Sequence, residues 1–469
     1  MKKSIHIAFL SVTVSVFSSV DAFAIECQIV PVNPAMILPF ILLLLAIALS
    51  PFVGKEWWGE NYPKVSFGLA AVSIIYYLFF IHNSMRMLAT ALEYFSFICL
   101  IGSLFVVSGG IHIRVKGKST PVANVLMLAV GSVLANFLGT TGASMVLIRP
   151  FLKANKHRIS GYHMVFFIFI VSNIGGLLTP LGDPPLFLGY LKGVPFFWCM
   201  GNLCQIWLIA TSIVLLVFYL IDRHNFSRLP YDMKDETEDE GEHAFVQGAH
   251  NLVFLILIII AVSLPEPLRE IIMISCAAAS YYTTKREVHR RNDFNFIPIK
   301  EVAVLFAGIF ATMVPALDWL ELNAGKLGIT EPGHFYWMTG ALSSVLDNAP
   351  AYLNFLSAAF GLHGLNVDNP THMQAMLCTL PAAEAGQIQS VIHAARQLKP
   401  DSWKYLQAIS AGAVMFGACT YIGNGPNFMV KSIAEQADVK MPSFIGYIFK
   451  YTIPVLLPVF IIIWLIFFR

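Results

Sequence analysis

Charged residues are scarce in this chain of 469 residues. Asp, Glu, Lys and Arg together make up 12% of it, whereas 57% of the residues are apolar. Soluble domains carry about 25% charged residues, so this chain has too few charges to cover a surface exposed to water. Lipid is therefore the expected solvent, and the length allows roughly ten membrane spans of ~20 residues once loops are subtracted.

A strong excess of basic residues and paired cysteines are also missing. The formal net charge is +2, and no basic stripe is present that could neutralise many phosphates, which argues against nucleic acid as a partner. The seven cysteines lie singly along the chain, without the short paired spacings that bind zinc or form a redox motif. We expect membrane lipid and a small inorganic cation or organic anion as partners, and no cofactor.

The first 24 residues have the pattern of a secretory signal peptide. Two lysines precede an apolar run over residues 5–20, and Ala22-Phe23-Ala24 offers a small-residue cleavage site. A short N-terminal anchor that is not cleaved is the alternative. In both cases the chain that follows starts outside the cytoplasm, and the expected location is the inner (plasma) membrane.

Ten apolar stretches are candidates to cross the bilayer once. They are 34–53, 64–82, 88–110, 161–192, 202–221, 244–264, 268–284, 300–320, 403–434 and 443–468. Two further apolar stretches, 120–152 and 332–360, are too long for one helix and carry polar, helix-breaking residues at their centres. We predict that these two form re-entrant hairpins.

Basic residues on both sides of the first predicted hairpin set its orientation. Lys116 and Lys118 precede it, and Lys153 and Lys156 follow it. Since basic residues of short loops stay in the cytoplasm, both flanks are expected on one face, and the segment must enter and leave by that face. If every span crosses once, the second hairpin opens on the outer face.

An acidic segment, 222–243, is expected to be a cytoplasmic linker between two halves of opposite orientation. The first half, 34–221, contains hairpin 120–152 and a broken helix over 161–192. The second, 244–468, contains hairpin 332–360 and a broken helix over 403–434. We predict an all-α polytopic membrane protein with two inverted-topology repeats, each with a re-entrant hairpin and a discontinuous transmembrane helix. Such folds bind substrate near the bilayer midplane, where the repeats meet.

The two broken helices share a short motif of Thr, two residues, Gly, Asp or Asn, one residue and Pro. It consists of Thr179, Gly182, Asp183 and Pro185 in the first half and of Thr420, Gly423, Asn424 and Pro426 in the second. Proline breaks a helix and glycine permits an unwound turn. Within a bilayer, unwound backbone persists only where it lines a cavity or is buried in protein. Its carbonyls, with Thr and Asp or Asn oxygens, suit Na⁺, although a structural Pro-Gly kink is the alternative.

Polar residues at the hairpin centres complete the candidate site. Asp183 and Asp347 are the acidic residues nearest the predicted midplane, where a carboxylate costs at least ~2.5 kcal/mol on insertion scales and usually marks an ion or proton path. A carboxylate that binds either Na⁺ or H⁺ couples the two ions in opposite directions. The candidate ion- or substrate-binding residues are Asn136, Thr140, Thr141, Ser172, Asn173, Thr179, Gly182, Asp183, Asp347, Asn348, Thr420, Gly423, Asn424 and Asn427. Among them Asp183 and Asp347 are the candidate Na⁺ ligands. Glu93 and Asp318 lie near predicted span ends, within reach of water, and are expected to be structural or interfacial.

At segments 136–144, 172–188, 347–350 and 420–427 the chain resembles the ion transporter superfamily. The motifs Ser-Asn-Ile-Gly-Gly, Thr-Pro-Leu-Gly-Asp-Pro-Pro and Asp-Asn-Ala-Pro are most similar to its branch of citrate transporters and NhaD-type sodium/proton antiporters. The resemblance covers about residues 34–468 and implies two inverted repeats, often in a homodimer. The hairpin centres lack the Ser-Asn-Thr of the dicarboxylate carriers, which weakens a dicarboxylate assignment.

Two transport functions follow as hypotheses. The first is Na⁺/H⁺ antiport through an Asp-based site at the midplane, and the second is cation-coupled uptake of citrate or another organic anion. An anion would need several fixed donors or cations, and Arg149 and His334 are the only cationic candidates near a hairpin, so antiport is favoured. A channel and a structural membrane scaffold are further alternatives. An intramembrane aspartyl protease is disfavoured because Asp183 lacks the preceding Gly-x-Gly, and we expect no enzymatic activity.

Overall fold

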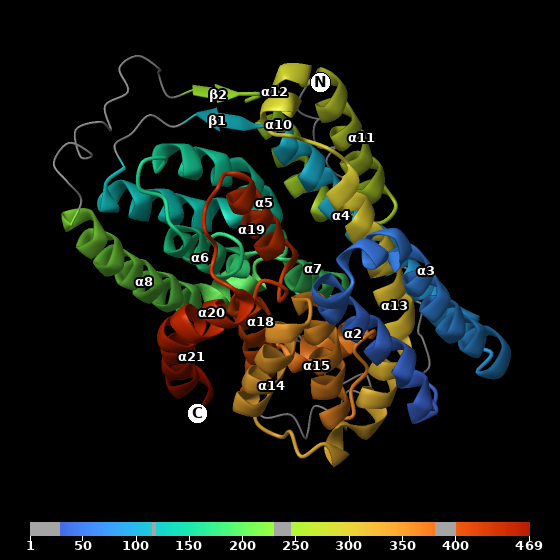
Figure 1. The fold of residues 1–469 in the computed structure, drawn as a ribbon. Coiled ribbons are helices and arrows are strands. Elements are labelled where there is room, and N and C mark those ends of the chain that lie inside the picture. Colours follow the sequence, from blue (N-terminus) through green and yellow to red (C-terminus); the bar gives the residue numbers. More distant parts are fainter. Residues whose placement is uncertain (1–28, 115–118, 229–244, 380–399) are drawn as a thin grey trace, which may run out of the picture.

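The computed structural model describes residues 29–114, 119–228, 245–379 and 400–469, and this part of the chain is helical apart from one pair of short strands (Figure 1). The elements of the first half are α2 (Leu38–Val53), α3 (Lys55–Ile75), α4 (Ser84–Gly109), β1 (His112–Arg114), α5 (Pro121–Ala154), α6 (Gly161–Ile170), η3 (Ile174–Leu178), α7 (Pro184–Leu191) and α8 (Trp198–Ser227). Those of the second half are β2 (Phe245–Gln247), α10 (Asn251–Val262), α11 (Leu268–Thr283), α12 (Arg286–Arg291), α13 (Ile297–Asn323), α14 (Pro332–Val345), α15 (Asn348–Leu362), α16 (Pro370–Met376), α18 (Trp403–Phe416), η5 (Gly417–Cys419), α19 (Gly425–Gln436), α20 (Phe444–Tyr447) and α21 (Leu457–Ile463). The expected leader, 1–24, lies outside the described residues.

Seven helices within the described ranges are long and apolar enough to cross a bilayer. They cover Glu56–Phe80, Ser84–Gly109, Pro121–Ala154, Gly161–Leu178, Trp198–Ser227, Ile297–Lys326 and Phe444–Phe468. The shorter helix α10 presents apolar side chains outward as well, since Val253, Ile256 and Ile260 are 58%, 55% and 56% exposed. The chain is a multi-pass membrane protein.

The boundary between the two halves differs from the expected one. α8 continues to Ser227, so residues 222–227 are helical rather than part of a linker, and Asp222 is buried. On the far side, β2 pairs antiparallel with β1, and α10 begins only at Asn251. The apolar pattern of the sequence could not predict β2, because a short strand forms only with a partner strand that lies far away in the sequence.

α5 folds back on itself at Gly139, which has φ 73° and ψ 158°, a conformation open essentially to glycine alone. Asn124 and Asn155 near its two ends exchange amide hydrogen bonds of 2.8 Å. In a straight helix these residues would lie ~46 Å apart. Buried Asp222 of α8 accepts hydrogen bonds from Asn124 (3.1 Å) and from Arg158 after the hairpin (Nη2, 2.9 Å), so both ends of the α5 hairpin are tied together.

α14 and α15 form a second helical hairpin, interrupted at Leu346 and Asp347. In Figure 1 the α5 hairpin lies in the upper half of the molecule and the α14–α15 hairpin in the lower half, with α7 and α18 between them. The turns of both hairpins meet at Asp183, because Thr140 of α5 and Asn348 of α15 both donate hydrogen bonds to it.

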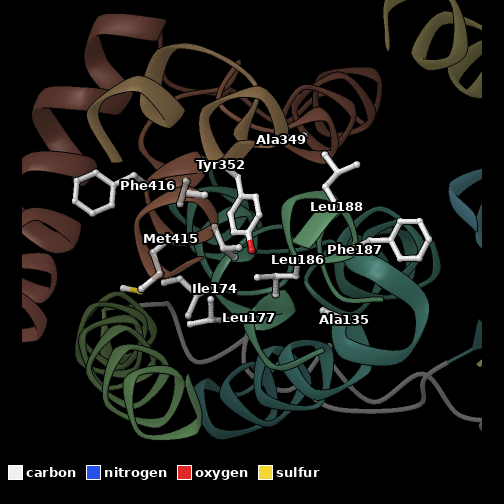
Figure 2. Close-up of a cluster of buried hydrophobic side chains, with 14 of the residues drawn as sticks. Ala135, Ile174, Leu177, Leu186, Phe187, Leu188, Ala349, Tyr352, Met415 and Phe416 are labelled. Carbon is white, nitrogen blue, oxygen red and sulfur yellow. The ribbon is translucent and has the colours of Figure 1, made fainter. Parts of the chain in front are cut away.

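The two predicted broken helices are interrupted in the same manner. In each, a helix passes through one 3₁₀ turn into unwound backbone, and a new helix starts at the motif with proline in its first turn: α6, η3 and α7 in the first half, α18, η5 and α19 in the second. A packed apolar cluster surrounds the break. Figure 2 shows Leu186 of α7, Tyr352 of α15 and Met415 of α18 in this cluster, all of them buried.

Candidate ion-binding site

Asp183 lies at the start of α7 and is 1% exposed. Its Oδ1 accepts hydrogen bonds from Thr140 Oγ1 of α5 (2.8 Å) and from Asn424 Nδ2 before α19 (3.1 Å), and its Oδ2 accepts one from Asn348 Nδ2 of α15. All three donors are neutral. Both hairpins and both broken helices thus meet at one buried carboxylate.

The Asp183 side chain occupies the N-cap position of α7 but makes no capping hydrogen bond to that helix. Asn424 at the start of α19 likewise does not cap its own helix. A polar residue at this position normally accepts a hydrogen bond from the first turn of the helix. Both side chains face the central site instead of their own helices.

An amide cluster joins the two broken helices beside Asp183. Asn173 Nδ2 donates to Asn427 Oδ1 (2.7 Å), and Asn424 Nδ2 donates to Asn173 Oδ1 (3.2 Å) and to the Ser172 carbonyl (3.1 Å). Asn427 in turn donates to the Gly417 and Thr420 carbonyls (2.8 and 2.9 Å). These amides hold the unwound segments of the two halves together.

Each threonine of the shared motif ties its broken helix to the hairpin of the same half. Thr179 Oγ1 donates to the Asn136 carbonyl of α5, and Thr420 Oγ1 donates to the Ser344 carbonyl of α14 (2.7 Å). Asn136 Oδ1 also accepts a hydrogen bond from the Leu178 backbone (2.8 Å). Each hydroxyl also accepts the N–H of its motif glycine (3.1 Å), so both threonines hold the unwound turns in place in this conformation.

The motif glycines are required by close backbone contacts. A Cβ on Gly182 would lie 2.1 Å from the Gly176 carbonyl oxygen, and a Cβ on Gly423 would lie 2.5 Å from that of Gly417. Gly176 and Gly417 each lie three residues before the motif threonine, so the repeated pattern extends to this glycine. Each unwound turn thus folds back onto its own 3₁₀ turn with room for hydrogen only.

Asp347 has different surroundings from Asp183. Its Oδ1 accepts the Ala349 N–H (3.1 Å), so it caps α15, and the residue is only partly buried. Asp347 lies one residue before Asn348, which bonds Asp183. The structure therefore brings Asp347 to the edge of the Asp183 site but does not connect the two carboxylates by a shared donor.

A pocket of about 50 Å³ opens beside Asp183, between α4 on one side and the α5 turn and α7 on the other. Thr140, Thr141, Gly182 and Asp183 contribute its polar part, and Leu104 of α4 lies among the apolar residues that line the rest. A cavity needs only ~10–15 Å³ of such space to hold one water. The pocket thus has room for a small ion together with a few waters.

Asn348 Oδ1 is a buried oxygen without a hydrogen-bond partner among the described residues. The residue is 0% exposed, and its amide nitrogen faces the Asp183 carboxylate. Turning the amide round would bring two oxygens together, so the orientation is set by Asp183. A buried acceptor without a donor is costly, and a bound cation or water would satisfy it.

Ser172 does not line the pocket. Its hydroxyl shares a 2.9 Å hydrogen bond with that of Ser144 on α5, and both residues are fully buried. The remaining predicted residues, Asn136, Thr140, Thr141, Asn173 and Gly182, come from the same two elements, α5 and the first broken helix. In the second half, Thr420, Gly423, Asn424 and Asn427 come from the second broken helix.

Sequence reasoning missed a group of buried charged side chains away from Asp183. Arg86 of α4 and Lys192 after α7 are buried among carboxylates, whereas the sequence suggests only Arg149 and His334 as cations near a hairpin. The interpretation of Asp318 as water-accessible is wrong, because it is 0% exposed and pairs with Arg86 at 2.8 Å. Proximity along the sequence gives no signal for such pairs, since Arg86 and Asp318 lie 232 positions apart and Lys192 and Asp368 lie 176 apart.

Comparison with known proteins adds one finding. The model of a protein family described as "Putative citrate transport" matches residues 30–468, nearly the whole chain. No curated protein matches the chain significantly.

Proposed function

The chain belongs to this citrate-transport family, a family of transporters, and on that premise we propose that it is a secondary active Na⁺/H⁺ antiporter. Asp183 is the residue that binds Na⁺ or H⁺ in alternation. Asn348 Oδ1 and the Asp183 carboxylate supply the first oxygens for Na⁺, and Asp347, the residue before Asn348, joins them when the pocket changes shape. Because one carboxylate cannot hold both ions at once, each Na⁺ that enters displaces a proton.

The observation that carries the proposal is a buried carboxylate with neutral partners only. Burying a charge is costly unless an opposite charge compensates it. The donors to Asp183 are a hydroxyl and two amides, none of which carries a charge. A proton or a small cation supplies the missing positive charge, and either fits the adjoining pocket of about 50 Å³.

The symmetry of the contacts supports two inverted repeats. Asp183 and Asn424 are motif counterparts and contact each other (3.1 Å), as expected of residues near a two-fold axis. The two hairpins approach them from opposite halves of the molecule (Figure 1). We propose that α5 re-enters from the cytoplasmic face and α14–α15 from the outer face of the inner membrane. The homodimer stays a prediction from the resemblance.

Cation-coupled citrate transport is the second candidate, favoured by the family description. The helix starts at Pro184, Asn348 and Gly425 all lie at the centre, and helix N-termini favour anions. Against it, a pocket of about 50 Å³ is far below the ~300 Å³ of typical organic-ligand sites. Asp183 would also repel a carboxylate unless a cation were bound first.

Purified protein in liposomes tests both candidates. A pH-sensitive dye is trapped inside, and Na⁺, Li⁺ or citrate is added outside. For antiport, Na⁺ alone drives protons out of the liposomes, so the dye reports a rise in internal pH, and citrate adds nothing. Accumulation of labelled citrate driven by an ion gradient, with no dye response to Na⁺ alone, would overturn the ranking.

A further inference from the structure

A second group of buried charges lies beyond the far end of α7, away from Asp183. Asp368, in the loop between α15 and α16, accepts hydrogen bonds from Arg86 Nη1 and from Lys192 Nζ. The side chains of Arg86, Lys192 and Asp368 are 2%, 5% and 11% exposed. One carboxylate is therefore shared by two cations, and all three side chains are almost completely buried.

Arg86 and Lys192 also form ion pairs with carboxylates on α13 and α4, two helices that make no hydrogen bond to Asp183. Arg86 of α4 also binds Asp318 of α13, through Nη2 (2.8 Å) and Nε (3.1 Å). Lys192 also binds Glu93 of α4 at 2.6 Å. The group thus joins α4 and α13 to the end of α7 and to the loop that follows the α14–α15 hairpin.

Next to these charges, α13 also packs closely against α15 and the loop that follows it. A Cβ on Gly361 of α15 would lie 2.0 Å from the Glu321 carbonyl oxygen of α13, and Glu321 Oε1 accepts the Val367 N–H at 3.3 Å. Burial raises the pKa of Asp368, but the Lys192 ammonium and the Arg86 guanidinium lower it by more, so the net pKa lies below the usual range. Asp368 is therefore ionised, and the contact between the two groups of helices is both tight and charged.

We propose that Asp368, Lys192, Arg86 and Glu93 form an ionic latch that holds α7 and the α14–α15 hairpin against α4 and α13 in this conformation. Asp368 is its central positioning residue. The latch rests on the proposed transport function, because a carrier must separate such contacts to expose its site to the opposite face. α7 starts at Asp183 and ends beside Lys192, so release of the latch frees the helix that carries the ion-binding carboxylate.

Cysteine labelling tests the latch without any transport. In a variant whose seven native cysteines are replaced by serine, Leu100→Cys places a thiol on α4, where the 2% exposed residue lines the pocket opposite α7. The rate of reaction with a water-soluble maleimide then reports the separation of α4 from α7. Breaking a buried ion pair by removing one partner is strongly destabilising, so Asp368→Asn should raise the rate at least ~10-fold.

Matched variants separate the latch from a general loss of structure. Asp368→Glu keeps the charge and should stay within about threefold of the starting rate, since most of the effect of a buried pair depends on charge. Glu435→Gln, which removes the exposed pair with Lys431 on α19, should leave the rate unchanged. Lys192→Gln should raise the labelling rate as Asp368→Asn does. If neither variant folds, Glu93→Gln, which removes the more exposed partner of Lys192, is measured in their place and should also raise the rate.

A labelling rate in Asp368→Asn equal to that of the starting protein, in a sample that elutes as folded, would overturn the latch. An equal rise in Glu435→Gln would overturn it too, because the effect would then not depend on the buried charges. The labelling needs no Na⁺ gradient, so failure of Na⁺/H⁺ exchange in liposomes, with the labelling as expected, would refute the proposed antiport alone.

Discussion

Asp183 and Asp368 are both carboxylates at junctions between the halves of the chain, and their partners are opposite in kind. Asp183 is 1% exposed and accepts hydrogen bonds from a threonine and two asparagines. Asp368 accepts hydrogen bonds from an arginine and a lysine. Both arrangements satisfy the oxygen atoms, but only the second balances the charge.

The different partners suit the two carboxylates to different roles. In this conformation fixed cations neutralise Asp368, so it holds helices together and has little tendency to bind a further cation. Neutral donors orient Asp183 but leave its charge open, and in the proposed function a mobile proton or Na⁺ supplies the balance. Substitutions that exchange these properties are the way to test the comparison.

The largest expected effect is that of Asp183→Asn. The amide keeps the size of the side chain but can neither titrate nor bring a charge to Na⁺. We expect Na⁺-dependent proton flux in liposomes to fall ~10- to 150-fold for each charged contact that is lost, since such contacts are worth ~1.5–3 kcal/mol each. Membrane insertion should be unchanged, and wild-type flux in this variant would remove the assigned site.

Gly423→Ala should disrupt the crossing of the unwound segments. The new Cβ would lie 2.5 Å from the Gly417 carbonyl oxygen and 2.8 Å from that of Ser343. Overpacking of this kind costs ~1–3 kcal/mol, so the thermal melting temperature and the flux should both fall.

Gly425→Ala, two residues on, is the matched control because nothing lies within 4 Å of its added Cβ. Equal melting temperatures for the two alanine variants would mean that the close contact between the unwound turns does not exist.

Asp347→Asn separates capping from ion binding at the second hairpin. Asn is as good an N-cap as Asp, so α15 should keep its start and the protein its melting temperature. If Asp347 contributes charge to the ion site, coupled flux should fall about tenfold or more, as for the loss of one charged contact. Flux equal to that of the wild type, measured with the same dye assay, would restrict Asp347 to capping.

Asn348→Ala tests the buried amide oxygen that has no hydrogen-bond partner. The change removes both a donor to Asp183 and a candidate Na⁺ ligand. A single hydrogen bond is worth ~0.5–1.5 kcal/mol, so we expect the apparent Na⁺ affinity to weaken about three- to tenfold. Asn202→Ala on α8, where the amide donates only to the Trp198 carbonyl of its own helix, should leave the Na⁺ affinity as it was.

Much of the central region could be predicted from the sequence because its signals are local. The motif around Asp183 and Asn424 identifies the unwound segments by proline and glycine, and polar residues in apolar surroundings identify the hairpin turns. The hydrogen bonds from Thr140 and Asn348 to Asp183 connect residues that were named as site candidates for these reasons.

The latch could not be predicted in the same way. Lys192, Asp368 and Arg86 lie at the ends of apolar stretches, where charged residues normally reach water, and no local pattern marks them as buried. Their burial follows from the packing of α13 against α15 and of α4 against α7, which brings together residues 176 and 282 positions apart. Only the three-dimensional arrangement shows that these charges neutralise one another.

Calorimetric titration of the purified protein with Na⁺ at several pH values tests the central claim most directly. If Na⁺ and H⁺ compete for Asp183, Na⁺ affinity should fall as the pH is lowered, by up to ~10-fold per pH unit, because binding must displace a proton. The heat should also depend on the ionisation enthalpy of the buffer, and Asp183→Asn should bind no Na⁺. Na⁺ binding that is independent of pH, or retained in Asp183→Asn, would contradict the account.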